Sequence, residues 1–111
     1  MTATIPVQLT FRGLSTSAAV DAEVRNRVAW LEQFHPDLMD CRVLVDVPHR
    51  HRQSGRQFHL RVEISVRSHD PLIIEREDAD VYVAIHRAFD AARRRLEDIA
   101  RERRGAVKTH H

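Results

Sequence analysis

Cysteine, glycine and long apolar runs are scarce in this sequence of 111 residues. Cys41 is the only cysteine, which excludes an internal disulfide and fits a reducing, cytoplasmic compartment. The three glycines form no glycine-rich phosphate loop. No segment approaches the roughly 18 apolar residues of a membrane helix, and the first residues lack the basic and apolar parts of a secretory signal. We therefore expect no membrane association.

Arginine dominates the charge that is present. The formal net charge is +2, and Lys108 is the only lysine among 18 basic residues. The planar guanidinium group matches phosphate geometry and stacks on bases, which suits RNA. A GC-rich genome would give the same bias, so arginine content alone does not decide the partner. The length predicts one domain over residues 1–111, with an ordered core at about 5–104 and a tail at 105–111.

Alternation of apolar and polar residues predicts four strands, at residues 5–12, 41–47, 58–67 and 72–75. Gly13 ends the first strand, and the composition of residues 68–71 indicates a turn before the last. In the third strand the residues expected to face the core are Phe58, Leu60, Val62, Ile64 and Val66.

Two helices are predicted between and after these strands. The first begins after Ser17 as N-cap and ends near Phe34, because Pro36 disfavours helical geometry at His35. Its core positions are Val20, Val24, Val28 and Leu31. The second begins after Asp78 or Asp80 and runs to about Arg104, where Gly105 is expected to form a left-handed C-terminal cap. Its buried face comprises Val81, Ile85, Ala88, Phe89, Ala92, Leu96 and Ile99.

The element order is therefore β-α-β-β-β-α, and the fold class is α+β. The helix between the first two strands favours a parallel pair, and the remaining strands form an antiparallel meander. Each strand has one apolar face, so both helices should cover the same side of a four-stranded sheet.

The second helix carries most of the basic residues. Residues 84–108 contain eight basic and four acidic residues, and Arg87, Arg94 and Arg101 recur every seven positions. This spacing places these three residues, here called the heptad arginines, along one flank, where they suit a row of phosphates. Alternatively, they belong to a solvated face stabilised by Asp90–Arg94 and Glu97–Arg101 ion pairs.

Residues 48–56 form a second basic cluster. Arg50, Arg52 and Arg56 suit phosphate contacts better than a metal site, and the alternative is a mobile hairpin tip. His49 and His51 have a spacing found in metal sites, but no cysteine or carboxylate nearby completes a ligand set. We expect no bound metal.

The sequence contains no convincing set of catalytic side chains. We therefore expect no enzymatic activity and no cofactor or small-molecule substrate. Cys41 should face the core as an inert thiol. The acids Glu75, Glu77, Asp78 and Asp80 are better explained by capping of the second helix. Trp30 lies beside the core stripe of the first helix, either as a lid on the core or as a platform for an RNA base; we favour the lid.

Two segments resemble a known family. The run from Glu77 to Ile85, EDADVYVAI, resembles the E-x-x-D-x-Y-x-A-I motif of ribosome hibernation-promoting factors, once described as sigma-54 modulation proteins. Leu31-Glu32-Gln33-Phe34 resembles the L-E-R-Y/F segment of the same proteins. With the matching element order, the resemblance spans roughly residues 6–104.

The resemblance implies a fold similar to double-stranded RNA-binding domains and a partner, the small ribosomal subunit. It also implies contacts with 16S rRNA that block the mRNA and tRNA sites and inhibit translation. Arg27 and Arg94 fall where the family carries basic residues. The candidate RNA-binding residues are Arg27, Arg50, Arg52, Arg87, Arg93, Arg94 and Arg101.

The chain also departs from the family pattern. Basic residues of relatives are replaced at Asn26, Trp30, Ala91 and Asp98, whereas Arg87, Arg93 and Arg95 are basic where relatives usually are not. Residues 48–51 and 104–109 also look like a subgroup in which this domain precedes a cold-shock domain, which implies that the chain is one domain of a longer protein. A generic structured-RNA-binding domain and a protein-interaction module modulating a transcription factor remain alternatives, and the oligomeric state is open.

Overall fold

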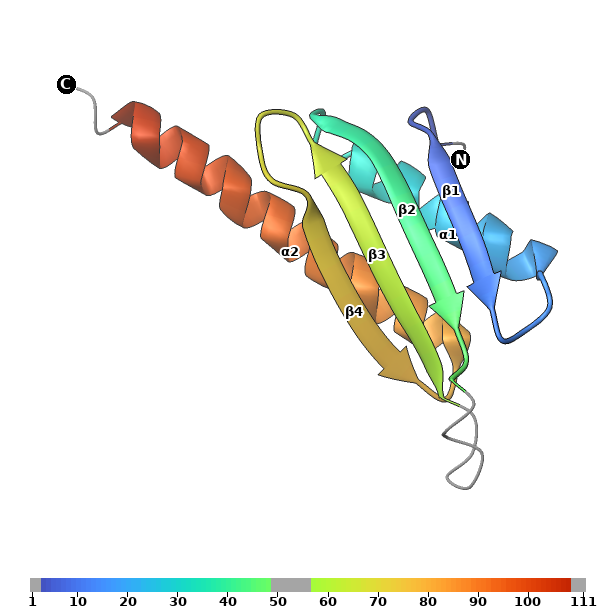
Figure 1. Cartoon of the computed structure of the whole chain (residues 1–111). Coiled ribbons are helices and arrows are strands. Elements are labelled where there is room, and N and C mark those ends of the chain that lie inside the picture. The colour runs from blue at the N-terminus through green and yellow to red at the C-terminus, as the bar shows by residue number, and fades with distance from the viewer. Residues whose placement is uncertain (1–2, 49–56, 109–111) are drawn as a thin grey trace.

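The computed structural model describes residues 3–48 and 57–108. Within them the chain forms β1 (Val7–Arg12), α1 (Ala18–Glu32), β2 (Leu38–Asp46), β3 (Phe58–Val66), β4 (Leu72–Asp78) and α2 (Val81–Lys108) (Figure 1). The predicted element order and the α+β class are confirmed.

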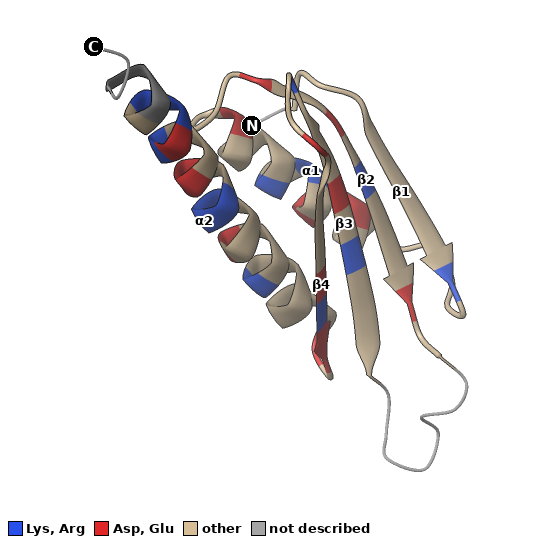
Figure 2. Ribbon diagram, turned by 60° about the vertical axis from the view of Figure 1, so that its left-hand side comes forward, with Lys and Arg blue, Asp and Glu red and all other residues tan. Residues whose placement is uncertain are grey.

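The four strands form one mixed sheet in the order β1-β2-β3-β4. β1 and β2 are parallel, with Val7 opposite Cys41 and Phe11 opposite Val45, as the intervening helix predicts. The other neighbouring strands are antiparallel. Both helices lie on the same face of the sheet, as expected from the single apolar face of each strand, and the opposite face is open (Figure 2).

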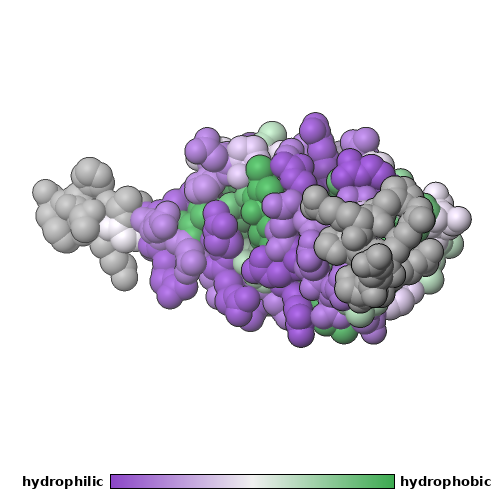
Figure 3. Space-filling model, turned by 60° about the horizontal axis from the view of Figure 1, so that its bottom comes forward, coloured by the Kyte–Doolittle hydropathy of each residue, from purple (hydrophilic) through white to green (hydrophobic). Residues whose placement is uncertain are grey.

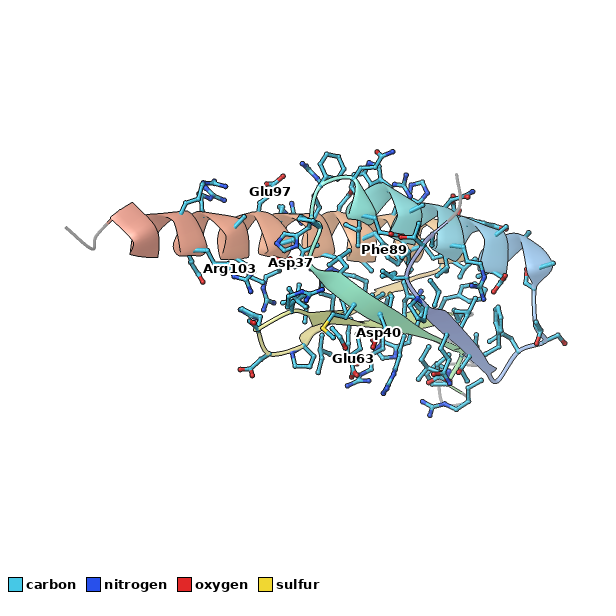
Figure 4. The ribbon with its side chains drawn as sticks, turned by 90° about the horizontal axis from the view of Figure 1, so that it is seen from above. Asp37, Asp40, Glu63, Phe89, Glu97 and Arg103 are labelled. Carbon is cyan, nitrogen blue, oxygen red and sulfur yellow. The ribbon has the colours of Figure 1, made fainter. Side chains whose placement is uncertain are left out.

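The core lies between the sheet and the helices. Alternate residues of β2, β3 and β4 and most of the predicted helix stripes are buried, and the inward residues of β1 are partly buried against the same core, which confirms the apolar faces expected from the sequence. Phe89 is fully buried in the first half of α2 and lies between the helices and the sheet (Figure 4). The largest side chains that accompany it are Leu31, Leu60, Ile64, Leu72, Ile85 and Leu96.

The strand boundaries differ from the predictions, most clearly in β4. β1 begins at Val7 rather than Ile5, and β2 begins at Leu38, with an irregularity between Leu38 and Asp40. β4 continues beyond Glu75 to Asp78 because the long β3 pairs with it throughout, with His59 opposite Glu77. The prediction that all the acids of residues 75–80 belong to the helix cap is therefore wrong, since three of them lie in the strand.

The N-terminal caps of the helices follow the predictions. The Val20 N–H donates to Ser17 Oγ at 3.2 Å, which confirms Ser17 as the cap of α1. At α2 the cap is Asp80, because its Oδ1 accepts the N–H groups of Tyr82 and Val83 at 2.8 and 3.4 Å. The carboxylate of Asp78 accepts the Asp80 N–H at 2.9 Å instead.

The predicted C-terminal end of α2 is wrong. The helix continues through Gly105 to Lys108, so residues 105–108 are not a tail and Gly105 forms no left-handed cap. A glycine within a helix destabilises the helix by about 1 kcal/mol relative to alanine. This penalty is not large enough to end α2 at Gly105. The last turns project beyond the sheet (Figure 1). α1 ends at Glu32, two residues before the expected position.

Candidate RNA-binding surface

The outward side of α2 is the most basic helical surface in the described residues. Arg87, Arg94 and Arg101 are all exposed, while the buried residues of α2 face the sheet. The structure thus places the heptad arginines on one outward flank, as their spacing predicts. In Figure 3, the surface beside the C-terminal end of α2 is largely hydrophilic. The role of the heptad arginines in RNA binding stays a prediction.

The heptad arginines differ in their ion pairs. Arg87 Nη1 lies 3.1 Å from Asp78 Oδ2, and Arg101 Nη2 lies 2.6 Å from Asp98 Oδ1. Arg94 makes no ion pair with any described residue. Neither the Asp90–Arg94 nor the Glu97–Arg101 pair of the solvated-face interpretation forms; Glu97 instead pairs with Arg93 at 2.7 Å. Exposed pairs contribute only about 0–1 kcal/mol, so phosphates can replace these carboxylates at little cost.

Arg27 and Arg93 belong to a different group, which links the two helices. The Cζ atoms of Arg27 and Arg93 lie 4.6 and 5.8 Å from the centroid of the Trp30 ring. Phe34 contacts Trp30 edge to face, with ring centroids 5.2 Å apart. We call these four residues the arginine–tryptophan cluster. Two guanidinium groups thus lie against the Trp30 ring, which favours a packing role for Trp30 over that of a platform for a base.

Trp30 is therefore expected to stabilise the fold more than it contributes to RNA binding. Trp30→Ala removes a half-buried aromatic ring and both cation–π interactions, and should lower the free energy of unfolding by about 1–3 kcal/mol. Urea denaturation followed by circular dichroism measures this decrease. Unchanged stability together with a collapse of ribosome affinity would show that Trp30 acts as a stacking platform after all.

A shallow hollow of about 340 Å³ lies next to the arginine–tryptophan cluster. Its lining residues come from α2 and from the end of α1, and are Phe34, His35, Arg93, Leu96, Glu97, Ala100, Arg101 and Arg104. Phe34 is 50% exposed, so one side of its ring faces this hollow and solvent. The sequence placed Phe34 at the end of the first helix and in the family-like segment 31–34, but gave no indication of this hollow.

His35 is buried, and burial lowers the pKa of its imidazole more than the nearby Asp37 carboxylate raises it; Arg103 also lowers it. Arg103 holds this end of the molecule together, with Nη1 2.9 Å from Asp37 Oδ2 and Nη2 donating to the Arg67 carbonyl oxygen at 2.7 Å. Figure 4 shows Arg103 beside Asp37. We conclude that Arg103 is a structural residue that ties α2 to two loops.

Several predicted residues lie outside the described part of the chain: His49, Arg50, His51, Arg52 and Arg56. In residues 3–48 and 57–108, no group of three or more histidine, cysteine or carboxylate side chains could hold a metal ion. The same residues contain no helix that is both long and apolar enough to span a membrane.

Cys41 lies in the core, as expected. Burial, assisted by the Asp40 carboxylate, raises the pKa of its thiol to about 12. The thiolate is the reactive form, so at pH 8 the native protein should react with an aromatic disulfide reagent far more slowly than the urea-unfolded protein. Absorbance of the released chromophore measures both rates. Equal rates would contradict the buried position of Cys41.

A family model described as Sigma 54 modulation protein / S30EA ribosomal protein matches residues 7–104. The chain belongs to this family. A search of curated protein sequences gave no match. Among solved structures, the Protein Y N-terminal domain of Thermus thermophilus is similar, with a TM-score of 0.71, 20% identity and coverage of 89% of this chain and 99% of that one. A ribosomal subunit interface protein from Coxiella burnetii has a TM-score of 0.71 and 10% identity, covering 86% of this chain and 98% of that one. At these identities the structures establish the fold alone.

The motif at residues 77–85 joins β4 to α2, and its residues have distinct structural roles. Glu77 lies in the strand and Asp80 caps the helix. Ala84 and Ile85 are fully buried, whereas Tyr82 remains 41% exposed. The motif therefore fixes where α2 begins and which side of it faces the core, and this in turn sets the direction of the heptad arginines.

Proposed function

We propose that this chain is a ribosome-associated translation inhibitor, a hibernation factor that binds 16S rRNA of the small ribosomal subunit. Bound there, it blocks the mRNA and tRNA sites by occupying them and needs no catalysis. Membership of a family whose description names a ribosomal protein supports this proposal, as does the fold shared with a ribosomal subunit interface protein.

One structural observation carries the proposal: the exposed row of Arg87, Arg94 and Arg101 on a single helix flank. Arginine forks bind phosphates in a bidentate manner. Arg94 can bind a phosphate without giving up an ion pair, and Arg87 and Arg101 exchange exposed carboxylates for phosphates. The flank is continuous along α2, which suits a run of backbone phosphates better than a single small anion.

Sedimentation through a sucrose gradient tests this function. The protein should move with purified small ribosomal subunits, and an excess of mRNA and initiator tRNA should displace it. It should also inhibit cell-free translation in proportion to the fraction of small subunits occupied. A protein that remains at the top of the gradient, even at low salt, would refute the proposal.

Two rival functions make different predictions in the same assays. A generic structured-RNA binder would bind unrelated folded RNAs as tightly as the small subunit, and mRNA and tRNA would not displace it selectively. A module that modulates a transcription factor would bind neither folded RNAs nor the small subunit. Its interaction with the transcription factor would not need the heptad arginines. The basic flank of α2 favours RNA over this last function.

A further inference from the structure

We propose that the hollow beside Phe34 is a subsite for one unstacked nucleotide of the bound RNA. The base stacks on the exposed side of Phe34, and the arginines at the rim, Arg101 and Arg104, hold the adjoining phosphate. This inference rests on the proposed function and specifies how the same helical surface engages its RNA.

Phe34 is the aromatic side chain of the cluster that remains accessible. Trp30 meets its ring at an interplanar angle of 76°, and the Arg93 Cζ atom lies 5.7 Å from its centroid. These neighbours fix the ring, yet 50% of the side chain stays exposed. An exposed, immobilised aromatic ring is well suited to stacking, because little conformational freedom is given up when a base binds.

The size of the hollow suits a single nucleotide. Its volume of about 340 Å³ is near the lower end of the roughly 300–1,000 Å³ typical of small-ligand pockets. A double helix cannot enter it, whereas a base turned out of a loop or bulge can. Recognition of single-stranded RNA commonly stacks unpaired bases on aromatic rings and guanidinium planes.

The charge around the hollow selects an anionic ligand. Arg93, Arg101 and Arg104 line it, against the single acid Glu97. Among the described residues Arg104 has no ion-pair partner, so its charge is available to a phosphate. The Nε–H of Arg93 is buried without an acceptor. A small shift of that side chain would bring this donor to a base carbonyl or ring nitrogen in the hollow.

Substitutions of Phe34 separate stacking from simple apolar packing. We compare Phe34→Tyr, which keeps an aromatic face, with Phe34→Leu and Phe34→Ala, which do not. Met39→Ala is the matched control, because Met39 is apolar and 52% exposed but lies on β2. Affinity for purified small ribosomal subunits is measured at several salt concentrations, and circular dichroism confirms that each variant is folded.

Phe34→Leu and Phe34→Ala should both weaken binding by about 5- to 150-fold, the range for one base–aromatic stack. Phe34→Tyr and Met39→Ala should bind like the unaltered protein. The salt slope should be unchanged in all four variants, because every arginine that binds a phosphate is still present. Ultraviolet irradiation of the complex should link the peptide containing Phe34 to a nucleotide of 16S rRNA, as identified by mass spectrometry.

Normal binding by Phe34→Leu would overturn the subsite while leaving the proposed function intact. Cross-linking of the Phe34 peptide to a ribosomal protein instead of RNA would also overturn it. If the unaltered protein fails to bind small subunits, both the proposed function and the subsite are refuted. If Phe34→Ala does not fold, the comparison of Phe34→Leu with Phe34→Tyr still tests whether binding requires an aromatic ring at this position.

Discussion

Replacing Phe89 with alanine is expected to lower the free energy of unfolding by about 3–5 kcal/mol. Phe89 is the largest of the fully buried side chains and lies between the helices and the sheet. Its removal leaves a cavity that the surrounding strands cannot close without moving. Domains of ordinary stability unfold at a cost of about 5–15 kcal/mol, so this single substitution removes a large part of the total.

Urea denaturation followed by circular dichroism measures the decrease, and Phe34→Ala provides a matched control. Both substitutions remove the same side chain, but Phe34 is 50% exposed whereas Phe89 is fully buried. Phe34→Ala should lower the free energy of unfolding by no more than about 1 kcal/mol. Equal decreases for the two variants would show that α2 does not pack on the sheet through Phe89.

The period of apolar residues was sufficient to predict most of the fold. Alternation identified the four strands, and helical spacing identified the buried sides of both helices, because burial of one face produces these patterns directly. The length of β4 could not be predicted in this way. Glu77 and Asp78 look like capping residues in the sequence, and only pairing with β3 shows that they continue the strand beyond Glu75. Gly105 was wrongly predicted to end α2. That prediction relied on helix propensity, which is a weak guide at a solvent-exposed helix end.

The candidate site was only partly predictable. Heptad spacing correctly placed Arg87, Arg94 and Arg101 on one exposed flank, because that arrangement depends on a single helix. The packing around Trp30 depends on two helices that are distant in sequence, so neither its stacking with Arg93 nor the exposure of Phe34 followed from the sequence pattern. The sequence likewise does not distinguish Arg103 from the other basic residues of α2. Its structural role follows from its ion pair with Asp37, which is distant in sequence.

The double variant Arg87→Glu, Arg94→Glu should bind small ribosomal subunits about 100-fold more weakly near 0.1 M salt, if each arginine binds one phosphate. The slope of log affinity against log salt should flatten by about 0.7–0.9 for each phosphate that the variant no longer binds. The fold should survive, because both side chains are exposed and removal of the Arg87–Asp78 pair costs only about 0.2–1 kcal/mol. Binding is measured by sedimentation and translation inhibition in a cell-free extract.

Two controls separate local phosphate binding from an effect of total charge. Arg42→Glu, Arg61→Glu makes the same change in net charge on the open face of the sheet, where both arginines lie near Glu63. Because that face is opposite the helices, this variant should retain most of its affinity and its salt slope. Arg50→Glu, Arg52→Glu, in the segment outside the described residues, is also expected to reduce the affinity for small subunits less than the helix variant does. If the loop variant loses translation inhibition while the α2 variant keeps it, the ribosome can remain the target, but the heptad arginines are not the surface that binds it.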